Sequence, residues 1–165
     1  MKGNSSAMEA TVIKDAESKE EIEQVRMLFV EYAKSLSFPL DFQGFEKELS
    51  HLPYEYVPPG GALLLATLQG RPAGCVALRM IDSETCEMKR LYLRDKFRGL
   101  GLGKRLAVST LEKASNLGYK RMRLDTIPSM DQAISLYRQL GFQEIEPYRH
   151  NPVPGALFME LNLQN

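Results

Sequence analysis

The stretch Arg98-Gly99-Leu100-Gly101-Leu102-Gly103-Lys104 alternates three glycines with two leucines between two basic residues. An apolar segment before it, Met88 to Leu93, predicts a strand, and apolar residues at helical spacing from Leu106 to Leu117 predict a helix after it. The first N–H groups of a helix lack internal partners, and glycine lets a phosphate approach them closely. The stretch therefore predicts either an anion site or a plain strand-to-helix connection.

The spacing of this loop excludes two well-known phosphate-binding motifs. A Walker loop requires serine or threonine after its lysine, and here Arg105 follows Lys104. A dinucleotide-binding fingerprint requires its third glycine one position later than Gly103, and it follows an early strand, whereas no early strand precedes this loop.

Length and charge place further limits on the protein. The chain has 165 residues, which suggests a single domain over residues 1–165. Lys plus Arg equals Asp plus Glu at 21 each, which argues against a nucleic-acid partner recognised through a general basic field. The longest apolar run, near Ala62 to Ala66, is too short to span a membrane, so no membrane partner is expected.

The N-terminal segment and the cysteines indicate a cytoplasmic protein. Residues 1–10 are small and polar without the apolar core of a signal peptide, and residues 1–9 are expected to be disordered. Two cysteines, Cys75 and Cys86, are too few for a disulfide framework and are expected to be buried free thiols. His51 and His150 lie far apart, and no metal-ligand spacing appears.

Periodicity along the chain predicts seven strands and four helices. Ser18 with Glu21 forms a capping box for the first helix, Asp41 is expected to cap the second, and Ser129 is expected to cap the fourth. Hairpins and strand-helix-strand units coexist, so the predicted fold is α/β (α+β) with one mixed sheet. The predicted strands are residues 10–15, 62–68, 73–81, 86–93, 121–126, 142–146 and 157–163.

Three motifs in order resemble the GNAT superfamily of N-acetyltransferases. The pattern Arg-x-x-Gly-x-Gly from Arg98 to Gly103 resembles the family's acetyl-CoA pyrophosphate loop. The segment Glu87 to Leu93 looks like its central strand, and Ala133 to Phe142 is similar to its later helix-turn-strand signature. Together these matches cover roughly residues 74 to 146, which makes them far more specific than one glycine pattern.

The resemblance implies a seven-stranded sheet with helices on both faces, whose central strand splays from its parallel neighbour to hold acetyl-CoA. No metal is expected, because the sequence shows no metal-ligand spacing. One departure is visible, because Met130 stands where the family often has an asparagine. The residues implied to bind the cofactor lie on the central strand and in the loop: Leu91, Tyr92, Leu93, Arg98, Gly99, Leu100, Gly101, Leu102, Gly103 and Lys104.

The resemblance also suggests catalytic residues for acyl transfer to an amine. Glu87 is the candidate general base, directly or through a water, with Glu84 and Asp125 as alternatives. Tyr137 is the candidate acid that protonates the leaving thiolate, since a phenol is protonated at neutral pH. The structural alternatives are an exposed strand glutamate and a packed core tyrosine.

The expected acceptor is the primary amine of a small molecule. A peptide or protein amine is the alternative among enzymes, and a non-catalytic CoA-binding sensor or interaction module is the alternative outside them. The sequence also leaves a homodimer open. Five further residues could line the acceptor site or serve only in packing and on the surface: Tyr54, Tyr56, Arg90, Arg123 and Arg149.

Overall fold

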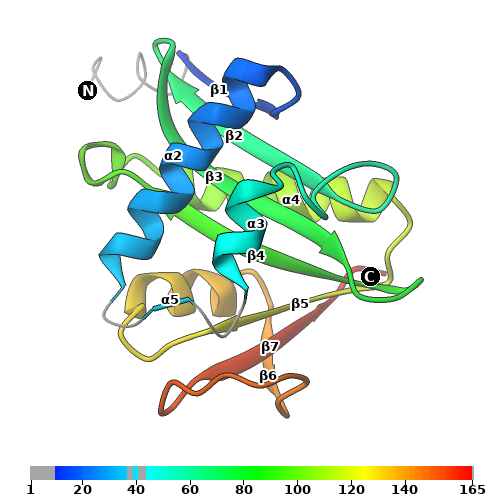
Figure 1. Cartoon of the computed structure of the whole chain (residues 1–165). Helices are drawn as coiled ribbons and strands as arrows, with labels where there is room; N and C mark the ends of the chain where they lie inside the picture. The colour runs from blue at the N-terminus through cyan, green and yellow to red at the C-terminus, as the bar shows by residue number, and fades with distance from the viewer. Residues whose placement is uncertain (1–9, 37–38, 41–43, 165) are drawn as a thin grey trace.

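The structure is a computed structural model that describes residues 10–36, 39–40 and 44–164. Its strands form one mixed sheet in the order β1-β2-β3-β4-β5-β7-β6 (Figure 1). The described part of the chain contains no helix that is long and apolar enough to cross a membrane. The elements are β1 (Thr11–Asp15), α2 (Lys19–Ser35), α3 (Phe45–Ser50), β2 (Ala62–Leu68), β3 (Arg71–Met80), β4 (Thr85–Leu93), the 3-10 turn η2 (Asp95–Phe97), α4 (Leu102–Asn116), β5 (Arg121–Thr126), α5 (Asp131–Gln139), β6 (Gln143–Ile145) and β7 (Leu157–Asn162).

The predicted order of strands and helices and the mixed seven-stranded sheet are confirmed. The capping box of α2 is also confirmed, because Ser18 Oγ accepts from the Glu21 backbone N–H at 3.1 Å and the Glu21 carboxylate accepts from the Ser18 N–H. The disorder expected for residues 1–9 lies outside the described residues.

The caps predicted for α3 and α5 need correction. The cap of α3 is Gly44, in a left-handed conformation with φ of 68°, and Asp41 lies outside the described residues. The cap of α5 is Met130 rather than Ser129, and neither α3 nor α5 has a side-chain cap hydrogen bond. At α5 the carboxylate of Asp131 lies in the first helical turn, where it complements the helix dipole without a serine cap.

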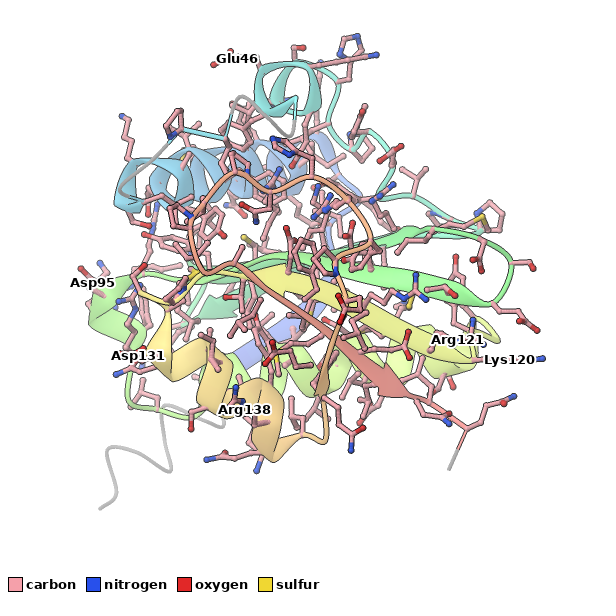
Figure 2. All side chains as sticks on the ribbon, turned by 90° about the horizontal axis from the view of Figure 1, so that it is seen from below. Glu46, Asp95, Lys120, Arg121, Asp131 and Arg138 are labelled. Atoms are coloured by element: carbon pink, nitrogen blue, oxygen red, sulfur yellow. The ribbon has the colours of Figure 1, made fainter. Side chains whose placement is uncertain are left out.

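Two helical layers cover the sheet, with α2 and α3 on one face and α4 and α5 on the other (Figure 2). Strand β2 serves both layers because successive side chains of a strand point to opposite faces. Leu63 and Leu65 pack in the cluster that contains α2, and Leu64 and Ala66 pack in the cluster that contains α4. The sheet between these two layers is interrupted at one strand, β4.

The interruption lies in β4 and has two parts. Between the pairs Ala77–Lys89 and Cys75–Tyr92, β4 contains one more residue than β3, which is a β-bulge, and Arg90 in the bulge has φ of 62°. The parallel pairing of β4 with β5 covers only residues 85–87 of β4 and 121–123 of β5, although both strands continue beyond it. The two central strands therefore splay apart, as expected.

The long loop between β6 and β7 crosses to the face of the sheet that carries α2 and α3 (Figure 2). There the Tyr148 hydroxyl donates to Glu87 on β4 at 2.6 Å, and Arg149 forms an ion pair with Asp125 on β5 at 2.6 Å. The loop thus spans the splayed strands and closes one side of the gap between them.

Candidate active site

The glycine loop leaves the start of α4 open. Gly99 and Gly101 have φ of 83° and 77°, a left-handed conformation that favours glycine, and α4 begins at Leu102 without a side-chain cap. A Cβ atom added at Gly99 or at Gly101 would meet no heavy atom within 4 Å. The first N–H groups of α4 can therefore reach a ligand on this side, where the helix dipole favours negative charge.

Two arginines fix the segment between β4 and this loop. Arg98 donates to the Leu93 carbonyl oxygen from Nε at 3.2 Å and forms an ion pair with Asp95 at 2.9 Å. Arg94 binds Glu31 on α2 through two hydrogen bonds of 2.9 and 2.6 Å. The loop is therefore fastened both to the end of β4 and to α2.

A cleft of about 790 Å³ runs from this loop along the splayed end of β4. Leu100 and Lys104, two of the residues expected at the cofactor site, do not line it. Residues 129–133 at the start of α5 form its opposite wall. They include Met130, the residue expected as asparagine from the resemblance noted in the sequence. The expected residues that do line it are Leu91, Tyr92, Leu93, Arg98, Gly99, Gly101, Leu102 and Gly103.

A smaller cavity of about 50 Å³ lies between β4 and β5 and shares Tyr32, Leu91 and Met130 with the cleft. Its wall also includes Tyr137 from α5 and Asp125 from β5. The two spaces are therefore adjacent. A donor in the cleft and an acceptor in the small cavity would meet at the residues that both spaces share, with Tyr137 in the wall of the small cavity.

Tyr137 combines a packed ring with a hydroxyl suited to proton donation. Its ring meets Phe142 edge-on, with 5.7 Å between centroids, and the residue is 7% exposed. Its hydroxyl makes no hydrogen bond within the part of the chain that the structure describes. Burial raises the pKa of Tyr137, so the hydroxyl keeps its proton at neutral pH.

Glu87 lies at the centre of a network on the face covered by α2 and α3. It is fully buried, and it accepts from Arg79 Nε at 2.7 Å and from the Tyr148 hydroxyl at 2.6 Å. Arg149 adds an ion pair at 3.1 Å. Burial raises the pKa of Glu87, but the nearby cations and the Tyr148 hydrogen bond outweigh it, so that the pKa is below its usual value. Glu87 lines neither the cleft nor the small cavity.

The two alternative carboxylates occupy different places. Asp125 lines the small cavity, and it accepts from Arg149 at 2.6 Å and from Asn151 at 3.0 Å. Glu84 lies at the turn before β4, where it pairs with Lys120 at 2.5 Å and lines neither space. The geometry therefore favours Asp125 over Glu84 as the second candidate.

The arginines that could orient an acceptor carboxylate all have carboxylate partners within the protein. Arg123 pairs with Glu160 at 2.8 Å, and Arg149 pairs with Glu87 and Asp125. Arg90 is buried and pairs with Glu48 on α3 at 2.7 Å. Of these three arginines, only Arg90 lines the small cavity.

Neither Tyr54 nor Tyr56 lines the cleft or the small cavity. Tyr56 is 2% exposed, and its ring meets Phe29 of α2 edge-on. Both tyrosines therefore belong to the packing under α2 and α3. Cys75 and Cys86 are buried free thiols, as expected.

Sequence reasoning missed four residues near the site. A hairpin centred on Ser83 pairs residue 79 with residue 87, so the contact between Arg79 and Glu87 could have been found from the turn. Strand alternation could also have placed Lys89 on the face of Glu87. No sequence signal connects Tyr148 with Glu87, or Glu48 with Arg90.

Comparison with known proteins agrees with this geometry. The sequence model described as the acetyltransferase (GNAT) family matches residues 22–142. An uncharacterised N-acetyltransferase of Schizosaccharomyces pombe is 38% identical over 146 residues, covering 87% of this chain and 90% of that protein. The human N-acetylaspartate synthetase is 34% identical over 103 residues, which cover 62% of this chain and 34% of that enzyme. A GNAT family acetyltransferase from Elizabethkingia anophelis, solved with acetyl-CoA bound, aligns with a TM-score of 0.63 at 20% identity, covering 93% of this chain and 98% of that one.

Proposed function

The chain belongs to the GNAT family of acetyltransferases, and from this premise we propose that it transfers acetyl from acetyl-CoA directly to the primary amine of a small molecule. The observation that carries the proposal is the junction of two spaces. The cleft along β4 and the glycine loop meets the small cavity between β4 and β5 at Tyr32, Leu91 and Met130, and Tyr137 lines the small cavity. A two-substrate transfer requires such a meeting point, with the donor and the acceptor arriving from different sides.

The glycine loop fits the diphosphate of CoA. The N–H groups at the start of α4 are open, and the sides of Gly99 and Gly101 are free of protein atoms. Leu91, Tyr92 and Leu93 of β4 would bind the pantetheine arm with their backbone groups, as an added strand would be bound. When bound, acetyl-CoA supplies an activated acyl group, and the protein positions it and manages the protons.

Backbone and side-chain groups beside the small cavity have distinct proposed roles. The bulge at Arg90 and the splay from β5 free backbone N–H groups of β4, one of which would donate to the acetyl carbonyl oxygen. The Tyr137 hydroxyl would donate its proton to the leaving thiolate sulfur, a role supported by its raised pKa and by the absence of a hydrogen-bond acceptor for it among the described residues.

For the general base we propose Glu87 acting through an intervening group. Glu87 lines neither space and already accepts from three donors, so a water or a neighbouring side chain would have to carry the proton to it. Asp125 is the direct alternative because it lines the small cavity.

A small acceptor fits better than a peptide. The loop between β6 and β7 closes the α2 side of the gap, and the cavity beside Tyr137 has a volume of only about 50 Å³. The likeness to N-acetylaspartate synthetase makes aspartate one acceptor worth testing. We also propose that the enzyme acts in the cytoplasm. A homodimer stays a prediction that light scattering after size-exclusion chromatography would test.

The experiment is a thiol-release assay with acetyl-CoA and a panel of amines, with mass spectrometry of the products. The panel contains amino acids, polyamines, amino sugars and a lysine-containing peptide. We expect release above background with a small amine and an acetylated amine of the matching mass. Binding of acetyl-CoA without turnover of any amine would favour the CoA-binding sensor, and turnover of the peptide alone would favour a protein acetyltransferase.

A further inference from the structure

Lys89 on β4 is a cation in the wall of the small cavity. It is half-buried and lines the cavity together with Asp125 and Tyr137. Within the described residues its ammonium makes no hydrogen bond and no ion pair. An ammonium withdrawn from water is costly unless an anion accompanies it, so this position is suited to an anionic group from outside the protein.

The carboxylates nearby are already bound by other groups. Arg79 and Arg149 bind Glu87, and Arg149 with Asn151 also binds Asp125. Glu48, on α3 over the same face of the sheet, is bound through both oxygens by Arg90. Burial and the charge of Arg90 lower the pKa of Lys89 to about 8, with Glu87 acting in the opposite direction. Lys89 is therefore mostly protonated at neutral pH, and no ion pair among the described residues compensates its charge.

This uncompensated charge bears on the acceptor. An amine in water at neutral pH is itself a cation, and a second cation beside Lys89 would be repelled. An acceptor that carries a carboxylate near its amine removes this repulsion and gains a charge-assisted hydrogen bond. The volume of about 50 Å³ admits only a few heavy atoms, which suits the amine and carboxylate end of an amino acid.

We infer that Lys89 binds the α-carboxylate of the acceptor and that the acceptor is a small amino acid rather than a polyamine or an amino sugar. This inference rests on the proposed function, but its central claim, anion binding by Lys89, can be tested without turnover. Lys89 is then a specificity residue, distinct from the groups that move protons at the amine and the sulfur.

The kinetic test compares each of three amino acids, aspartate, glutamate and alanine, with its α-amide, and adds putrescine as an amine without a carboxylate. We expect the acids to exceed their amides in kcat/KM by about tenfold or more, the range for a hydrogen bond to a charged group. Lys89→Gln should remove this preference, chiefly through KM, and leave the amides unchanged, whereas Lys89→Arg should keep most of it. Lys120→Gln is the matched control, because Lys120 lies at the rim of the sheet far from Asp131 (Figure 2).

A melting experiment separates this inference from the proposed function. Succinate without acetyl-CoA should raise the Tm of the parent and of Lys89→Arg, and it should not raise that of Lys89→Gln. If no amine is acetylated but succinate still protects through Lys89, the transfer activity fails and the anion site stands. Equal turnover of acids, amides and putrescine would overturn the inference. An equal fall in kcat for acid and amide in Lys89→Gln would also overturn it, since Lys89 would then act in the chemistry.

Discussion

Glu48 on α3 binds Arg90 in the β4 bulge through both carboxylate oxygens, at 2.7 and 2.9 Å. Both residues are buried, at 1% and 5% exposure. The pair fastens α3 to the point where Arg90 adopts a φ of 62°, a conformation that L side chains rarely adopt. The bulge in β4 is thus held by an ion pair from another element.

Replacing one partner of this pair should affect both stability and catalysis. Glu48→Gln leaves a buried guanidinium without its carboxylate, and we expect a loss of about 3 kcal/mol or more in the free energy of unfolding. The loosened bulge should lower kcat, while affinity for acetyl-CoA through the glycine loop changes little. Denaturant unfolding, steady-state kinetics and calorimetric titration measure the three effects.

The double variant Glu48→Gln with Arg90→Met controls for the unpaired charge. Removing both charges should recover part of the stability lost in Glu48→Gln, because no ion is left buried alone. It should not recover kcat, since the tie between α3 and the bulge is still missing. Full kinetic recovery in the double variant would show that the pair does not position the bulge.

Substitution of Gly101 should abolish tight binding of acetyl-CoA. Gly101→Asn is the sharper variant, because asparagine tolerates the left-handed conformation that Gly101 adopts, with φ of 77°, whereas valine does not. The fold should survive, since an added Cβ meets no protein atom within 4 Å. We expect at least a tenfold loss of affinity by calorimetric titration with an unchanged melting curve. Unchanged affinity in both Gly101→Asn and Gly103→Val would remove the loop from the site.

The general base can be assigned by comparing Glu87→Gln with Asp125→Asn. Loss of a general base typically lowers the rate by roughly 100- to 10,000-fold. Loss of a base that acts through an intervening group should lower the rate less, by about ten- to a thousandfold. For Glu87→Gln we expect such a fall in kcat, recovered in part at higher pH, where more of the amine is neutral. A larger fall in Asp125→Asn than in Glu87→Gln, with both proteins folded, would transfer the role to Asp125.

The Glu87 carboxylate should also affect the stability of the protein at acidic pH. The folded pKa of Glu87 is below its usual value of 4.5. Its contribution to stability is therefore present above pH 4.5 and is lost as the pH falls through the lowered folded value. The difference in unfolding free energy between the parent and Glu87→Gln should narrow as the pH falls from about 5 to 3. Glu46→Gln, an exposed carboxylate on α3, is the control, and an equal narrowing there would contradict the assignment to Glu87.

Local patterns were enough to predict the order of strands and helices along the chain and the glycine-rich turn that precedes α4. The glycine loop, strand alternation and capping boxes depend on neighbours within a few residues, and Gly101 and Ser18 behave as their local sequence indicates. Met130 shows the limit of this reasoning, since it caps α5 without a side-chain hydrogen bond and gives no sequence signal.

The acceptor side depends on contacts between distant segments. Tyr148 and Arg149 reach Glu87 from a loop about sixty residues further along the chain, and Glu48 reaches Arg90 from 42 residues before it. A carboxylate that looked like an exposed strand residue or a free base is therefore fully buried and bound by three donors. The partners of the charged residues in this region therefore depend on tertiary packing, which no local sequence pattern encodes.

Tyr137 offers the test that separates a catalyst from a packed tyrosine. Tyr137→Phe removes only a hydroxyl that makes no hydrogen bond within the described residues, while the ring contact with Phe142 stays. The free energy of unfolding should therefore change by less than about 1 kcal/mol, the usual net worth of one hydrogen bond. If the hydroxyl protonates the leaving thiolate, kcat should fall about tenfold or more, because the raised pKa of Tyr137 keeps this proton available at the pH of the assay. A thermal melt and steady-state kinetics on the same preparation measure both quantities.

Phe142→Leu, which disturbs the ring but keeps the hydroxyl, should show the reverse, with a lower Tm and nearly normal kcat per folded molecule. A stable Tyr137→Phe protein with unchanged kcat would exclude Tyr137 as the acid and leave that role to water.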